Sequence, residues 1–241
     1  MKTTLKKVEE HFPHKTSYPD ALLNLYKHIG KTKFDDDLSI LSILDSMGLD
    51  WTLWNLRTVN SQDKELRLFA VWCARQVQHF MTDERSLVAL DMAEKYAHGE
   101  ASRDELAGAR VDAHKAYQDA EREYESASAR LNAQHQAAKK DSSRAAAWDP
   151  VPLANQCSTL CASKYAAKAA LGSAMHAGVC GGHVSDAGVA AHDAAQAAHK
   201  AFYHAAATNR TAIGASISRV CQDAEAAAQL AQEQELRRIC D

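Results

Sequence analysis

The apolar positions along the chain recur with the period of an α-helix, and they predict an all-α protein. Turn and breaker residues divide this pattern: Pro19 opens one run, and Gly30, Gly48 and Gly99 close others. We expect helices over residues 3–11, 19–29, 36–47, 49–58, 62–81, 84–98, 103–140, 153–178, 187–208 and 211–239. No segment alternates as a strand does, so the pattern predicts a multi-helix bundle.

The clearest helix junction lies between residues 84–98 and 103–140. Gly99 is typical of a helix end, and Ser102 followed by Glu105 forms the sequence of a capping box. Beyond this cap, small and apolar residues recur close to every seventh position: Leu106, Ala109, Ala113, Ala116, Tyr117, Ala120, Tyr124, Ala127 and Leu131. The stripe predicts a long, coiled-coil-like helix.

Alanine divides the chain into two parts. It occurs 6 times in residues 1–100 and 40 times in residues 101–241, while the larger apolar residues fall from 36 to 23. Alanine buries little area but lets helices approach closely. We therefore expect a compact helical domain over residues 1–100 and an alanine-rich domain with long helices over residues 101–241.

Charge and hydropathy narrow the functional classes. The chain of 241 residues has 28 Lys+Arg against 31 Asp+Glu, a net charge of -3, and a mean hydropathy of -0.40. It has no apolar run long enough to span a membrane and no secretion signal, which predicts a cytoplasmic protein without membrane contact. The charge disfavours nucleic-acid binding, and we interpret seven lysines in residues 1–33 as part of a solvated surface.

Four residues raise the question of a metal site. Cys157 and Cys161 lie four positions apart on a predicted helix, and Cys180 and His183 flank a Gly-Gly turn. Together they could form a tetrahedral zinc site, although their spacing matches no standard signature. Free cysteine is commonly a small buried apolar residue. We therefore predict no metal and no cofactor, and keep an uncharacterised zinc-containing enzyme as an alternative.

A search of the sequence for catalytic motifs gives no support for an enzyme. The sequence contains neither the GxSxG nucleophile motif nor the GxxxxGK[ST] phosphate-binding loop. His192, His199 and His204 are spaced seven and five apart on one predicted helix, which we interpret as partly exposed positions rather than a metalloprotease motif. These observations predict a protein that is not an enzyme.

Tryptophan and arginine concentrate between residues 48 and 85. Both residue types anchor protein interfaces, because they combine a large contact area with a polar group. The candidate partner-binding residues are Trp51, Trp54, Arg57, Arg67, Arg75, Asp83 and Arg85. The same pattern also fits a helical core in which Trp51, Trp54 and Trp72 point inward, and the sequence leaves both interpretations open.

Three stretches of this region carry a family resemblance. GLDWTLWNLR, RLFAVWCARQV and DERSLVALDMAEKYAHGEASRDELAGARVDAHKAY resemble a family of alanine-rich helical immunity proteins of toxin systems, with many relatives in phage genomes. The resemblance spans about residues 48–120. Its recurrent elements fall on Trp54 to Arg57, on Arg67 with Cys73 and Ala74, and on Asp83 with Arg85 through Gly99. The family often has proline where this chain has Ser86.

The resemblance implies a non-enzymatic inhibitor that binds and neutralises a bacterial defence effector or toxin. Such a phage anti-defence or immunity protein, similar in principle to an anti-CRISPR protein, would act in the host cytoplasm on a protein partner. The long helix over residues 103–140 suggests an alternative, a self-assembling structural protein that forms a homo-oligomer.

Overall fold

A computed structural model describes residues 1–11, 19–30, 36–59, 62–141, 149–174, 185–207 and 217–240. Within these ranges the chain forms ten α-helices, two short 3-10 helices and one pair of strands, which confirms the predicted all-α multi-helix bundle. The helices are α1 (Leu5–Glu10), α2 (Pro19–Ile29), α3 (Ile40–Met47), α4 (Leu49–Asn55), η1 (Leu56–Thr58), α5 (Asp63–Gln76), η2 (Gln78–Phe80), α6 (Glu84–His98), α7 (Arg103–Lys140), α9 (Val151–Ser173), α10 (Asp186–Ala206) and α11 (Ile217–Cys240).

The predicted helix boundaries are most accurate where local caps define them. Helices α6 and α7 span the predicted residues 84–98 and 103–140. Gly99 ends α6 in the left-handed conformation at φ 79°, and Ser102 and Glu105 form the reciprocal capping box. Residues 175–178, 208 and 211–216 of the predicted helices lie outside the described ranges.

Two short strands correct the expectation of a chain without strands. β1 (Lys2–Thr4) pairs antiparallel with β2 (Asp37–Ser39), with Thr3 opposite Leu38. The pattern had predicted helix from residues 3 and 36 onward, whereas α1 and α3 begin only after these strands. Three residues are too few to show an alternation of period two, so the pairing leaves no periodic signal.

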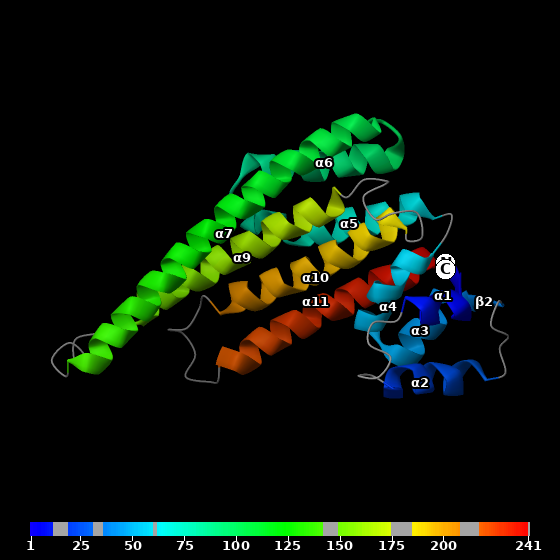
Figure 1. Cartoon of the computed structure of the whole chain (residues 1–241), viewed down its shortest axis with the longest axis horizontal. Coiled ribbons are helices and arrows are strands. Elements are labelled where there is room, and N and C mark those ends of the chain that lie inside the picture. Colours follow the sequence, from blue (N-terminus) through cyan, green and yellow to red (C-terminus); the bar gives the residue numbers. More distant parts are fainter. Residues whose placement is uncertain are drawn as a thin grey trace.

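Helix α10 lies at the centre of the bundle, where it contacts α9, α5, α11 and α4. Figure 1 shows α7 and α9 as a long pair, with α10 and α11 beside them and α1 to α3 gathered at one end. Bulky side chains such as Phe69 and Leu90 share one core cluster with alanines such as Ala166, Ala190 and Ala194. Residues 1–100 and 101–241 therefore meet in a continuous core, and their division into domains stays a prediction.

Two glycines allow the backbone of α10 to approach the backbones of η1 and α9 closely. A Cβ at Gly188 would lie 2.2 Å from the carbonyl oxygen of Leu56 in η1, and one at Gly172 would lie 2.9 Å from the amide nitrogen of Ala194. The Ser185 amide also donates to the Arg57 carbonyl oxygen at 2.7 Å. These contacts fix α10 between η1 and α9.

The stripe of small and apolar residues on α7 packs against other helices of the same chain. Leu106, Ala113, Ala116 and Ala127 are buried, and α7 packs against α6 and α9. The helix therefore needs no second copy of the chain to cover these side chains.

In the part of the chain that the structure describes, no helix has the length and apolar character required to cross a membrane.

Candidate functional site

A cleft of about 550 Å³ lies where α4 and α9 both pack against α10. This volume falls within the range of small-molecule sites. Helix α4 contributes Asp50, Trp51 and Trp54, helix α9 contributes Tyr165 and Lys168, and helix α10 contributes His192, Asp193, Gln196, Ala197 and Lys200. Aromatic, cationic and anionic side chains thus meet in one concave surface.

Several contacts hold the Trp54 side chain in place on α4. Its indole Nε1 donates to the carbonyl oxygen of His11 at 2.8 Å, and its ring meets His192 edge-on at a centroid distance of 5.5 Å. The Arg57 guanidinium carbon lies 3.5 Å from the ring centroid, and Arg57 Nε donates to the Trp54 carbonyl oxygen at 2.8 Å. The cation–π contact and the hydrogen bonds fix both side chains in one orientation.

The two acidic residues of the cleft have polar partners. Gln196 Nε2 donates to Asp50 Oδ1 at 3.1 Å, which joins α4 to α10. His192 Nδ1 lies 2.9 Å from Asp193 Oδ1. Both carboxylates are therefore already in contact with side chains of α10.

Basic side chains surround Tyr165, which lines the cleft from α9. The ring of Tyr165 stacks on His204 at 5.3 Å, and Nζ of Lys164 and Lys200 lie 4.8 Å and 5.8 Å from its centroid. Burial raises the pKa of Tyr165, so its hydroxyl stays protonated at neutral pH. Burial, together with Lys164 and Lys200, lowers the pKa of His204, which favours its neutral form.

Lys168 and Lys200 line the cleft without a carboxylate partner among the described residues. Lys168 lies on α9, three positions after Tyr165 and therefore on the same face of the helix. Asp50 and Asp193 balance the two positive charges within the lining, but neither carboxylate forms an ion pair with these ammonium groups.

The structure distributes the seven predicted partner-binding residues over four places. Trp51 and Trp54 line the cleft, and Arg57 lies against Trp54. Arg67 is only 4% exposed, with its guanidinium carbon 5.0 Å from the centroid of the Tyr96 ring. Arg67 therefore has little surface to offer a partner.

Arg75 joins α5 to α6. Its Nη2 lies 2.7 Å from Asp91 Oδ1 and 2.6 Å from Glu94 Oε2. Arg75 is thus engaged within the chain and lies apart from the residues that line the cleft.

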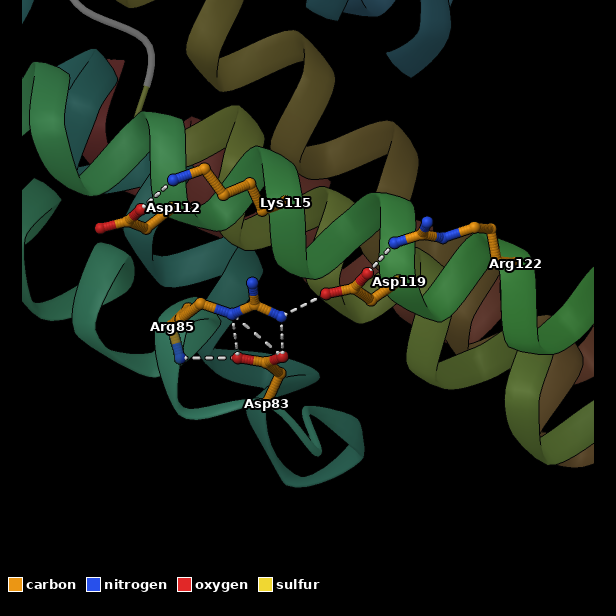
Figure 2. Close-up of polar contacts among 6 residues, drawn as sticks. All are labelled: Asp83, Arg85, Asp112, Lys115, Asp119 and Arg122. Atoms are coloured by element: carbon orange, nitrogen blue, oxygen red, sulfur yellow. Dashed lines mark hydrogen bonds and ion pairs between the residues drawn. The ribbon is translucent and has the colours of Figure 1, made fainter.

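The remaining two residues join the start of α6 to α7 (Figure 2). Arg85 Nη2 lies 2.6 Å from Asp83 Oδ2 and 2.6 Å from Asp119 Oδ2, and Asp119 also pairs with Arg122. Hydrogen bonds from Arg85 lower the pKa of both Asp83 and Asp119, so the carboxylates stay ionised. Asp83 and Arg85 thus form a junction between helices.

The structure also bears on the candidate zinc ligands. Cys157 and Cys161 are buried on α9, and Tyr124 is hydrogen-bonded to Cys161. Burial raises the pKa of Cys161, so the free thiol is protonated at neutral pH. Cys180 and His183 lie outside the described residues. Among the residues that are described, no group of three or more His, Cys, Asp or Glu side chains could hold a metal ion.

His199 corrects the expectation of partly exposed histidines. It is only 3% exposed on α10, its Nδ1 has no hydrogen-bond partner, and its Nε2 lies 3.9 Å from Glu225 Oε1 on α11. Burial lowers the pKa of His199. Packing of α11 over α10 covers this position, and the spacing of histidines on one helix cannot reveal such a contact.

Comparison of the chain with protein-family models, with curated proteins and with solved structures finds no match. The resemblance to immunity proteins over residues 48–120 therefore remains an expectation. The geometry of the cleft must support any function proposed for the chain.

Proposed function

We propose that the protein is a non-enzymatic inhibitor that binds a bacterial defence effector or toxin through the cleft and the adjoining Trp54–Arg57 pair. The observation that supports this proposal is the fixed arrangement of these two side chains beside a concave surface. Tryptophan and arginine dominate the binding energy of many interfaces. Side chains that are already held in place lose little conformational entropy when a partner binds.

The proposed contact surface comprises Trp51, Trp54, Arg57 and the residues of α9 and α10 that line the cleft. Arg75, Asp83 and Arg85 are left out, because their ion pairs join helices of the same chain. A partner side chain that enters the cleft would meet aromatic walls with charged groups at either side. The resemblance to immunity proteins suggests the class of partner.

A neutralisation assay tests the proposal. The chain is co-expressed with each member of a panel of bacterial toxins and defence effectors, and survival or restored phage growth is measured. We expect one member to be neutralised by the wild-type chain and by a control with Leu230→Ala, a substitution on α11 where Leu230 is 56% exposed. Trp51→Ala should abolish neutralisation, and because Trp51 is only partly exposed, circular dichroism and thermal unfolding must show that this variant is folded at the assay temperature.

Two results would contradict different parts of the proposal. If Trp51→Ala and Arg57→Ala neutralise the same partner as well as the wild type does, the cleft is not the contact surface. If the intact mass of the neutralised partner changes, the chain acts as an enzyme. Formation of a stoichiometric complex of two unmodified chains, measured by light scattering and mass spectrometry, is the expected outcome.

A further inference from the structure

We infer that the cleft is also a binding site for a nucleoside monophosphate, a ligand that combines a planar aromatic ring with a phosphate group. This site goes beyond the proposed function, because it assigns a small molecule to the cleft and needs no partner protein. The cleft combines two lysines that form no described ion pair, an aromatic lining and a volume that suits a small molecule.

Two lysines of the cleft can contact an anionic group. Lys168 of α9 and Lys200 of α10 line the cleft, and neither forms an ion pair with a described carboxylate, although Asp50 and Asp193 line the same surface. The protonated hydroxyl of Tyr165 adds a hydrogen-bond donor, and Lys200 Nζ lies 5.8 Å from the centroid of the Tyr165 ring. A phosphate group would accept charge-assisted hydrogen bonds from both lysines.

The carboxylates of the cleft offer hydrogen-bond acceptors. Gln196 occupies one site on Asp50, and His192 occupies one on Asp193, but each carboxylate can accept several hydrogen bonds. Amino groups of a base or hydroxyls of a ribose are donors that fit these oxygens. The carboxylates also repel a second anionic group, so the cleft favours a ligand with one anionic end.

Aromatic side chains also line the cleft. Trp51, Trp54 and Tyr165 line the cleft, and the contacts of Trp54 with Arg57 and His192 hold its indole in place. Stacking of an aromatic side chain on a nucleobase strengthens binding by about 5-fold to 150-fold per base. A ligand that has a phosphate but no ring would forgo these contacts.

The cleft volume of about 550 Å³ suits a small molecule of this kind. The same chemistry could come from a free nucleotide or from the phosphorylated end of a nucleic-acid strand. The net charge of -3 gives little attraction for a polyphosphate chain, which favours the free nucleotide. Because the nucleotide would occupy the surface around Trp51, it would compete with the proposed partner protein.

Calorimetric titration of the purified full-length chain with AMP, GMP, CMP and UMP tests the inference. We expect at least one of them to bind, and we expect its nucleoside and ribose 5-phosphate each to bind about tenfold more weakly or not at all. Lys168→Glu combined with Lys200→Glu should weaken binding by at least about tenfold. The control pair Lys139→Glu and Lys140→Glu, which makes the same change in net charge at the far end of α7, should leave binding within about twofold.

Four outcomes would overturn the inference. The first is that none of the four nucleotides binds at millimolar concentration, and the second is that inorganic phosphate binds as tightly as the nucleotide. The third is that the site pair and the control pair of substitutions weaken nucleotide binding equally. The fourth is that a 5′-phosphorylated oligonucleotide binds more tightly than the nucleotide, which would indicate the end of a nucleic-acid strand instead. The proposed function can be judged separately. A partner that depends on Trp51 but is indifferent to Lys168 and Lys200 would support that function even if no nucleotide binds.

Discussion

Replacing Gly188 with alanine tests the contact that positions α10. The added Cβ would lie 2.2 Å from Leu56 O, 2.4 Å from Leu56 C and 2.5 Å from Arg57 N, all of them backbone atoms of η1. Ordinary van der Waals contact begins at 3.4 Å, so α10 and η1 would have to separate by roughly 1 Å. Overpacking of this kind costs about 1–3 kcal/mol, while the helix propensity of alanine returns at most about 1 kcal/mol.

We therefore expect Gly188→Ala to lower the free energy of unfolding by about 2 kcal/mol, which corresponds to about 4–8 °C in the unfolding temperature of a chain of this size. The shift should also lengthen the hydrogen bond from the Ser185 amide to the Arg57 carbonyl oxygen, which spans the same junction. Urea unfolding followed by circular dichroism measures the free energy, and calorimetry measures the temperature.

Gly108→Ala provides the matched control. Gly108 is exposed on α7, and a Cβ there would meet nothing within 4 Å. Because only the helix propensity changes, we expect this variant to be more stable by about 0.5–1 kcal/mol. If the two variants shift stability in the same direction, the close approach of α10 to η1 is wrong.

Three further measurements follow from local features. Ser102→Ala removes the side-chain cap of α7 and should cost about 1 kcal/mol in urea unfolding; an unchanged midpoint would mean that the cap contributes nothing. Because burial lowers the pKa of His199 in the folded chain, its contribution to stability is complete above its ordinary pKa of 6.5 and declines as the pH falls below it. The urea midpoint should therefore fall between about pH 7 and pH 5, and His199→Gln should reduce that fall; an equal slope in both proteins would refute this assignment. Burial raises the pKa of the Cys73 thiol, so iodoacetamide should alkylate it only under conditions that unfold the chain. Mass spectrometry measures the alkylation, and rapid labelling of Cys73 in the folded chain would contradict its burial.

Local chemistry explains which parts of the fold could be predicted from the sequence. The junction at Gly99 and Ser102 depends on residues within a few positions of each other, so its signals are complete in the sequence. The pairing of Thr3 with Leu38 depends on a distant segment, and each strand is too short to show a period of its own. Tertiary contact, rather than intrinsic strand preference, produces this part of the structure.

Only the α4 side of the candidate site could be predicted from the sequence. Trp51, Trp54 and Arg57 stand out because tryptophan and arginine occur close together in the sequence. Lys168 and Lys200 belong to helices that the sequence describes mainly as alanine-rich, and neither has a motif around it. Their place beside the tryptophans follows from the packing of α4 and α9 on α10, which no local pattern encodes.

The alanine packing of α10 has an evolutionary consequence. Its buried face, which includes Ala190, Ala194 and Ala198, touches neighbouring helices so closely that larger side chains would force them apart. Glycine there would weaken the helix. Substitution can therefore accumulate mainly on the other face of α10, which carries Gln196 and Lys200 into the cleft. One helix thus has a face on which packing restricts substitution and a face toward the cleft on which it does not.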